Sequence, residues 1–296
     1  MSEFLTTREL AALLRVKERK IYDLAARGRI PVRRVTGKLL FPRREIEAWL
    51  GAETAAAADD GEAPAAVEAA RPLIVVGGHD PLLEWALRES RSGIAAFLDG
   101  ALDGLARAEA GACVAVGLHI PEPDGWNAAT VAGRFGEAPW VLLEWARRQR
   151  GLLFRSDLKR HPAGLRDVRG LRFQGRQPEA ASELVLDRLL ADARMTRADL
   201  TPVAGVERSE TDLAMAVASG RAEVGLGIAS AARQLNLEFV PLIEERFDLM
   251  VWRRAYFELP FQQFVAFCRA PAFAARARTL GGYDVSGFGT VHFNGR

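Results

Sequence analysis

The sequence predicts an α/β protein in which a small basic helical unit precedes a large domain of alternating strands and helices. Helix and hairpin signals crowd into residues 4–50, and positive charge is concentrated there. From Pro72 onward, short apolar runs alternate with helix-like runs, which is typical of an α/β domain. With 296 residues, 49% hydrophobic and 26% charged, the chain is long enough for two or three soluble domains.

The first unit begins with two predicted helices. Thr6 or Thr7 is suited to cap the first helix, and Glu9 then lies in its first turn. A second helix over about 17–26 is closed by Gly28. We therefore expect a helix-turn-helix at the start of the chain.

A hairpin and a third helix complete this unit. Gly37-Lys38 forms a tight turn between two β-rich runs, and Pro42 opens a helix that ends at Leu50. The order is that of a winged helix-turn-helix. Residues 1–50 carry 12 Lys/Arg and 6 Asp/Glu, a net charge of +6, whereas the whole chain carries +2 and the remainder therefore −4. Such a concentration suits phosphate neutralisation, and the alternative is a solvated basic face.

Residues 4–50 resemble the excisionase/MerR-type winged helix-turn-helix family. The resemblance is carried by L-T-T-R-E-L-A-A-L-L, V-K-E-R-K-I-Y, G-R-I-P-V-R-R-V and F-P-R-R-E-I-E-A-W-L. In that family the second helix enters the major groove of double-stranded DNA, and the wing meets phosphates or the minor groove. The DNA-binding residues implied by the resemblance are Lys17, Arg19, Lys20 and Tyr22 on the helix and Arg33, Arg34 and Lys38 on the wing.

Residues 51–71 are predicted to be a linker between residues 1–50 and a domain at 72–296. This stretch holds ten alanines, five acidic residues, two glycines and one proline, with no apolar periodicity. Gly61 and Pro64 interrupt any helix that the alanines favour. A long dimerisation helix is the alternative, but Val67 is its one large apolar residue.

The large domain is predicted from its alternating runs. Strands are expected at 73–76, 94–98, 112–118, 140–145, 152–154, 171–173, 203–206, 222–227, 239–240 and 247–252, and helices at 82–87, 99–110, 127–135, 179–193, 211–219, 261–269 and 271–280. Ligands of such domains bind beyond the carboxyl ends of strands, often at helix starts. The candidate ligand-binding residues at these places are Gly78, His79, Asp80, His119, Arg176, Gln177, Ser182 and Thr211.

The order of these units resembles the type II periplasmic-binding-protein fold in a cytoplasmic form. The carriers include G-G-H-D-P-L-L-E-W, R-F-Q-G-R-Q-P, V-A-S-G-R-A-E-V-G-L-G-I-A-S-A-A and L-G-G-Y-D-V-S-G. The resemblance implies two lobes, one of about 72–145 with 246–296 and the other of about 150–245, with the ligand in the cleft between them. The expected fold class is thus α/β, a winged helix-turn-helix plus a two-lobed type II periplasmic-binding-protein-like domain.

Two kinds of ligand remain open. The family tends to run Gly-Ser-Gly-Thr-Arg at the helix start where this chain has Glu179 to Glu183. If backbone amides and Arg176 dominate, the ligand is a small anion such as molybdate, tungstate, sulfate or formate. If Glu179, Glu183 and Asp212 point inward, a neutral, zwitterionic or metal-bearing ligand is favoured. We expect Glu179 and Glu183, four residues apart on one helix face, to lie together and mainly in solvent.

Several function classes find no support in the sequence. It lacks a transmembrane run, a signal peptide, a metal-ligand spacing and a P-loop or Gly-x-Ser-x-Gly motif. Cys113 and Cys268 are predicted to be reduced core residues, which with the missing signal peptide favours a cytoplasmic protein. We therefore expect no enzyme, no metal and no cofactor.

These observations together predict a ligand-responsive transcriptional regulator. Its partners would be double-stranded DNA and a small-molecule effector, and it would act as a homodimer or homotetramer, because one head covers few base pairs. The family resemblance implies a link to molybdenum or tungsten enzymes or their cofactor. The alternatives are an enzyme-like or carrier domain tethered to DNA, and an architectural DNA-binding protein whose second domain has lost its ligand.

Overall fold

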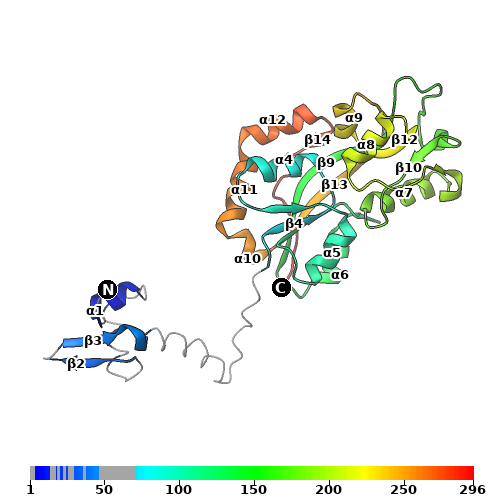
Figure 1. Cartoon of the computed structure of the whole chain (residues 1–296). Coiled ribbons are helices and arrows are strands. Elements are labelled where there is room, and N and C mark those ends of the chain that lie inside the picture. The colour runs from blue at the N-terminus through cyan, green and yellow to red at the C-terminus, as the bar shows by residue number, and fades with distance from the viewer. Residues whose placement is uncertain are drawn as a thin grey trace. The chain divides into compact units, whose positions relative to one another are not determined.

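The structure is a computed structural model that describes residues 4–13, 18, 21–22, 25, 30–35, 38–46 and 71–296. The chain divides into two compact units, Met1–Ala69 and Ala70–Arg296 (Figure 1). Within the described residues, no helix is both long and apolar enough to cross a bilayer.

The first unit contains a three-stranded antiparallel sheet and helical segments. Its elements are β1 (Phe4–Thr6), α1 (Thr7–Leu13), β2 (Arg33–Val35) and β3 (Lys38–Pro42), in the sheet order β1-β3-β2. The described residues at 18, 21–22, 25 and 43–46 are helical. β2 and β3 form the predicted hairpin, whereas β1, which pairs with β3, was not predicted.

Thr6 is the residue that caps α1. Its hydroxyl accepts from the Glu9 backbone N–H at 3.3 Å, while the Glu9 carboxylate accepts from the Thr6 backbone N–H at 2.8 Å. This reciprocal pair is a capping box and satisfies two otherwise orphaned donors. The apolar side chains buried behind it are Leu5, Leu10, Ala11, Ile21, Ile30, Phe41 and Ile46.

The second unit is built on a ten-stranded mixed sheet. The strand order is β11-β10-β12-β9-β13-β6-β4-β5, with β14 and β15 also paired to β9. The strands are β4 (Ile74–Gly77), β5 (Ala95–Phe97), β6 (Ala115–Leu118), β9 (Trp140–Phe154), β10 (Arg172–Gln174), β11 (Thr201–Pro202), β12 (Val224–Ile228), β13 (Glu238–Trp252), β14 (Tyr283–Asp284) and β15 (Val291–Asn294), and a separate hairpin joins β7 (Pro121–Glu122) to β8 (Gly125–Trp126).

Helices cover this sheet. They are α4 (Pro81–Glu89), α5 (Ala101–Glu109), α6 (Ala128–Phe135), α7 (Ala181–Asp192), α8 (Glu210–Ala218), α9 (Ala229–Gln234), α10 (Arg253–Tyr256), α11 (Leu259–Arg269) and α12 (Pro271–Leu280), with 3-10 turns at Leu165–Val168 and Arg197–Asp199. Most lie where the sequence predicts them. The predicted strand at 203–206 is wrong, because β11 ends at Pro202 and residues 203–206 form a loop.

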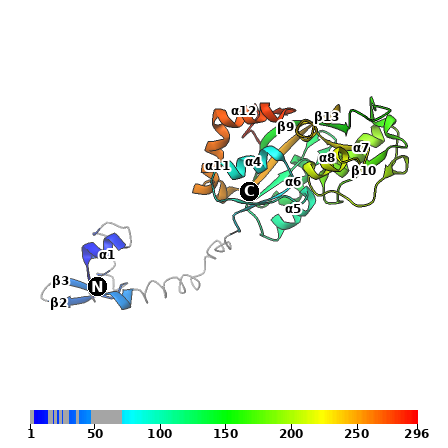
Figure 2. The same cartoon turned by 45° about the horizontal axis from the view of Figure 1, so that its top comes forward.

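Two 15-residue strands, β9 and β13, run through the centre of the unit and pair antiparallel over their whole length. The sequence predicted each as two short strands, since the polar run from Arg147 to Arg150 and the pair Glu244-Glu245 looked like interruptions. The β13 strand accommodates its length with irregularities at Pro241/Ile243 and Phe247/Asp248. In both views these strands pass from one half of the unit to the other (Figures 1 and 2).

The two halves are the lobes of the domain. Around β4, β5 and β6, the first lobe packs apolar cores that include Trp145, Phe264 and Trp140. Around β10 and β12, the second packs cores that include Phe173 and Leu213. Both lobes use β9, so neither has a sheet of its own. The predicted lobe limits, about 72–145 with 246–296 and about 150–245, stay a prediction.

Candidate functional site

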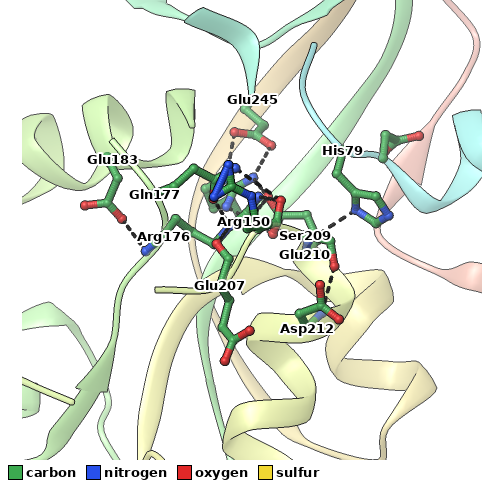
Figure 3. A network of polar contacts seen from close by, with 12 residues as sticks. His79, Arg150, Arg176, Gln177, Glu183, Glu207, Ser209, Glu210, Asp212 and Glu245 are labelled. Atoms are coloured by element: carbon green, nitrogen blue, oxygen red, sulfur yellow. Dashed lines mark hydrogen bonds and ion pairs between the residues drawn. The ribbon is translucent and has the colours of Figure 1, made fainter. Parts of the chain in front are cut away.

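Six charged side chains form what we call the buried charge network: Asp80, Arg148, Arg150, Arg176, Glu210 and Glu245. Figure 3 labels Arg150, Arg176, Glu210 and Glu245 of this network. None is more than 5% exposed, and three guanidinium groups face three carboxylates, so their formal charges cancel. Buried ions require partners and hydrogen bonds, because removing an ion from water is costly. The network is therefore a specified feature of the domain.

The two central strands supply the middle of the network. Arg148 and Glu245 are direct cross-strand partners, joined at 2.5 Å between Nε and Oε1. Arg150, two residues along the same face of β9, donates Nε to Glu245 Oε2 at 2.8 Å and Nη2 to Oε1 at 3.0 Å. The alternation of a strand places both arginines on one face. Burial tends to raise the pKa of Glu245, but the two arginines outweigh it and the pKa is lowered.

Glu210 extends the network into the second lobe. It is the first residue of α8 after the Ser209 cap, and its carboxylate accepts from Arg150 Nη2 at 2.7 Å and Arg150 Nη1 at 3.4 Å. The same carboxylate lies 3.0 Å from Arg176 Nη1. Burial raises the pKa of Glu210, but the attraction of Arg150 and Arg176 is larger in sum and brings the pKa to about 2. Glu210 is therefore ionised at neutral pH.

Arg176 also holds the loop that leads to α8. Its Nε donates to the Glu207 carbonyl and its Nη2 to the Arg208 carbonyl, both at 2.8 Å. Arg176 is buried and Glu179 is exposed, so the two do not form a surface ion pair. Burial lowers the pKa of the Arg176 guanidinium, which the Glu210 carboxylate only partly offsets.

Asp80 anchors the first-lobe end of the network. Its Oδ1 accepts from the Leu83 backbone N–H at 2.7 Å and from Trp145 Nε1 at 3.1 Å. Its Oδ2 accepts from Arg148 Nη1 at 2.8 Å and from the Tyr283 hydroxyl at 2.6 Å. Asp80 is thus the N-cap of α4 and has four protein partners, which explains its position without a ligand.

His79 connects the lobes through a backbone donor. The Glu210 N–H donates to His79 Nδ1 at 3.2 Å (Figure 3). In the neutral ring the proton therefore lies on Nε2, which is 3.4 Å from the carboxylate of Glu84. His119 stacks on Phe247 with ring centroids 5.6 Å apart. Burial lowers the pKa of His119 well below its usual value, and Arg148 and Arg150 lower it further, so this ring is neutral.

Several buried polar atoms near these residues have no hydrogen-bond partner within the described part of the chain. They are both ring nitrogens of His119, the Ser182 hydroxyl, Nη2 of Arg148, Oε1 of Gln174 and Nη1 of Arg176, whose contact with Glu210 is an ion pair. Ser182 lies in the first turn of α7, whose N-cap, Ala180, provides no side-chain acceptor. Buried polar groups are normally bonded, so these atoms are candidates for contact with water or a ligand.

The other predicted ligand residues have varied surroundings. Gly78 lies against His119, where an added Cβ would come within 3.0 Å of the ring. Gln177 is buried and donates to the Asp99 and Arg208 carbonyls at 3.3 Å. Thr211 is half-buried and is not the N-cap of its helix, because Ser209 fills that role. None of the three belongs to the buried charge network.

The expectation for the acidic pair was wrong in part. Glu179 is exposed and precedes α7, whereas Glu183 is partly buried, accepts from the Arg176 backbone N–H at 2.9 Å and pairs with Arg197. They do not share a face, since the helix begins at Ala181. Asp212 is exposed as well. The carboxylate that does point inward, Glu210, was not considered.

The sequence held signals for the residues that were missed. Arg148 and Arg150 are two residues apart on β9, which places them on one face of the strand, and Glu245 stands opposite Arg148 on β13. Glu210 follows Ser209, the residue that caps α8. The helix was predicted to begin two residues later, at Thr211, and Glu210 was therefore not considered as a site residue. Within the described residues, no group of three or more His, Cys, Asp or Glu side chains is placed to hold a metal ion.

The predicted DNA-binding residues are only partly described. Lys17, Arg19 and Lys20 lie outside the described residues. Tyr22 is 51% exposed, and Arg33 of β2 is exposed and pairs with Glu45 at 2.7 Å. Arg34 and Lys38 lie on the hairpin strands, as predicted for the wing. Their contacts with DNA stay a prediction.

Comparison with known proteins assigns the two parts. The profile of a helix-turn-helix domain matches residues 4–54. The profile of the PBP superfamily domain matches residues 84–269, more than half of the chain. The chain belongs to the PBP superfamily. A PBP superfamily domain behind a helix-turn-helix fits a ligand-responsive DNA-binding regulator.

Individual proteins are similar to this PBP superfamily chain over most of its length. The uncharacterized protein YvgK of Bacillus subtilis strain 168 is 25% identical over 262 residues, which cover 84% of this chain and 85% of YvgK. An ABC-transporter substrate-binding protein of Clostridium perfringens, solved with bound phosphate, has 10% identity and a TM-score of 0.53, covering 70% of this chain and 96% of that one. Peroxide-bound OxyR of Corynebacterium glutamicum has 14% identity and a TM-score of 0.48, covering 93% and 89%.

Proposed function

We propose that this protein is a one-component transcriptional regulator whose PBP domain binds a small anion and whose helix-turn-helix unit binds double-stranded DNA. The observation that carries the proposal is the convergence of polar side chains from both lobes, in a chain that also has a helix-turn-helix domain. His79 and Glu210 meet across the lobes, and Arg150 lies on a strand that both lobes share.

The hydrogen-bond donors around His79, Arg150 and Glu210 support an anion as the ligand. Arg150 and Arg176 supply guanidinium groups, and the first turn of α7 supplies backbone N–H groups and the unpartnered Ser182 hydroxyl. Molybdate, tungstate, sulfate and formate are the candidates, and a link to molybdenum or tungsten enzymes is part of the proposal. The buried charges already cancel, so a dianion is disfavoured unless a carboxylate leaves the network.

The candidate ligand-binding residues fall into two groups in this proposal. Gly78, His79, His119 and Ser182 border the place where the anion would bind, together with Arg176. Asp80 and Gln177 act through the elements they hold, and Thr211 lies in the first turn of α8, next to Glu210. On the DNA side, we propose that two or four copies place their heads on repeated half-sites, because a unit of about 50 residues reads few base pairs.

The DNA half of the proposal is tested with Arg19→Ala and Lys20→Ala. Each is expected to weaken binding to a selected operator by about 1–3 kcal/mol at moderate salt, because each removes one cationic contact with DNA. Lys159→Ala, which removes a charge from the other unit, is the control. Unchanged operator affinity in both head variants would show that the recognition helix is assigned wrongly.

The ligand half is tested by calorimetry and by thermal unfolding with the four candidate anions. A ligand that binds only the folded state raises the melting temperature. Operator affinity is measured with and without the anion that gives a response. If no small molecule of any charge changes stability or operator affinity, the regulator proposal fails.

A second candidate, an architectural DNA-binding protein without a ligand, is favoured by one specific observation. The carboxylates of the buried charge network already pair with its guanidinium groups, and Glu210 contacts both Arg150 and Arg176. In that case the network serves stability alone, and no anion will bind to it at physiological concentration.

A further inference from the structure

The position of Glu210 differs from that of an ordinary buried ion-pair partner. Its carboxylate is 1% exposed and lies between Arg150 and Arg176, two guanidinium groups that come from different elements (Figure 3). Arg150 meets it with Nη2 at 2.7 Å and Nη1 at 3.4 Å, one on each oxygen. This two-point contact is the geometry by which arginine recognises a planar carboxylate.

The other carboxylates of the network are fixed more firmly than Glu210. Glu245 lies in the middle of β13, and Asp80 has three partners in addition to the backbone N–H that it caps. Glu210 is the first residue of α8 and follows the loop 203–209, most of which is exposed. A change in this loop, which Arg176 holds through the Glu207 and Arg208 carbonyls, would release the side chain from the arginines without repacking of the strands.

We propose that the Glu210 carboxylate occupies the place of an effector's carboxylate, and that the effector is a small molecule bearing one planar carboxylate that exchanges with Glu210 on Arg150 and Arg176. This inference rests on the proposed function. It narrows the ligand class from any small anion to a carboxylate, because the guanidinium groups are arranged for a flat, singly charged group. The exchange keeps the buried charge balanced, which a tetrahedral dianion would not do.

The exchange also reaches the contact between the lobes. The backbone N–H of Glu210 donates to His79 of the first lobe, and the preceding Arg208 pairs with Asp99 at 2.8 Å. A shift of the first turn of α8 changes both contacts. Binding of the effector to Arg150 and Arg176 would thus also change the contacts between the lobes.

The test is to replace the carboxylate from solution. Glu210→Ala in the full chain removes the side chain and leaves the two guanidinium groups without it, so the variant is expected to melt lower than the wild type. Sodium acetate should restore the melting temperature of the variant in a saturable manner. The acetate concentration at half-maximal restoration should be at least tenfold lower than any concentration that affects the wild type. Sodium chloride at equal ionic strength should not do so.

Asp212→Ala is the matched control. Asp212 lies in the same helical turn and its loss also removes one negative charge, but its side chain is exposed. It should melt as the wild type does, without an acetate response. An equal acetate response in this variant would overturn the proposal, as would better rescue of Glu210→Ala by sulfate or molybdate than by acetate.

Glu210→Gln keeps the shape of the side chain and covers the case in which the alanine variant does not fold. Calorimetry should give an acetate dissociation constant at least tenfold lower for Glu210→Gln than for the wild type, because the competing charge is gone. A folded Glu210→Gln that binds acetate no better than the wild type would overturn the proposal. These measurements contain no DNA, so their outcome is independent of the regulator proposal. That proposal is tested separately by operator binding.

Discussion

At the scale of single residues, the second unit combines side chains that hold the fold with side chains that are suited to exchange. Asp80 belongs to the first kind, since four donors converge on its two oxygens. Removing its charge would leave Arg148 with one carboxylate partner, Glu245, in a buried place. Breaking a buried ion pair from one side is costly because the remaining ion stays desolvated.

We therefore expect Asp80→Asn to lower the free energy of unfolding of the second unit by about 3–5 kcal/mol. Denaturant unfolding followed by fluorescence measures this loss. Glu89→Gln, at the exposed end of the same helix, is the control and should lie within about 0.5 kcal/mol of the wild type. Equal stability of the two variants would contradict the assigned role of Asp80.

The pKa of Glu210 leads to a pH dependence with a definite sign. The folded-state pKa is about 2, below the ordinary value of 4.5, so ionised Glu210 stabilises the fold above pH 4.5 and this contribution is lost as the pH falls from 4.5 towards 2. The difference in unfolding free energy between the wild type and Glu210→Gln should shrink over this range. Denaturant titrations at several pH values measure it, and Asp212→Asn should follow the wild type. A difference that stays constant would contradict the assignment.

Part of this site was predictable from residues alone. His79 is buried beside the network and Asp80 and Arg176 belong to it, as strand-end reasoning suggested, because neighbouring strands end close together. Glu210, Arg150 and Glu245 were missed, since charged side chains on a strand or at a helix start are usually solvated. Their burial depends on which two strands become the shared centre of the domain, and that is a property of the topology.

At the scale of elements, the pairing of β9 with β13 places a strict steric requirement on the sequence of the second unit. At Gly151 an added Cβ would come within 2.0 Å of the Val240 carbonyl oxygen, in the backbone of the opposite strand. No rotamer change relieves such a contact, because backbone atoms define the ladder. Gly151 is thus required by the close approach of the two strands.

Gly151→Ala should lower the free energy of unfolding by about 2 kcal/mol or more, through displacement of the two strands. Gly133→Ala is a control with the opposite sign. Gly133 lies within α6 with nothing within 4 Å of an added Cβ, so alanine should raise the stability by up to about 1 kcal/mol. Chemical denaturation of both variants gives the comparison, and a neutral Gly151→Ala would argue against this strand pairing.

The sequence predicted most helices of the second unit because their apolar periodicity and caps are local signals. It failed on β9 and β13, whose polar middles read as breaks between short strands. Within a shared central strand, Arg148 and Arg150 can be buried because partners arrive from strands distant in sequence. Short-range patterns contain no information on such partners.

At the scale of the whole molecule, the chain consists of two compact units, 1–69 and 70–296, each with its own apolar core. We expect calorimetry to resolve two unfolding transitions. Operator DNA should raise the melting temperature of the small unit only, and an effector that of the large unit only. At a free-ligand concentration a hundredfold above the dissociation constant, the effector should add about 2.7 kcal/mol to the free energy of unfolding of the large unit. A single transition that responds to both would show that the units do not unfold separately.

The place of the last strand has a consequence for how the protein is made. Val291 and Asn294 of β15 lie beside Leu143 and Val141 of β9, and the ring of His292 lies 2.8 Å from the Glu144 carboxylate. During synthesis, the sheet of the first lobe therefore stays incomplete until residue 294 has left the ribosome. The helix-turn-helix segment emerges some 240 residues earlier. At ordinary elongation rates of about 5–20 residues per second, this is a lead of roughly 10–50 seconds. A nascent chain thus exposes its DNA-binding segment well before the sensor that would govern it can exist.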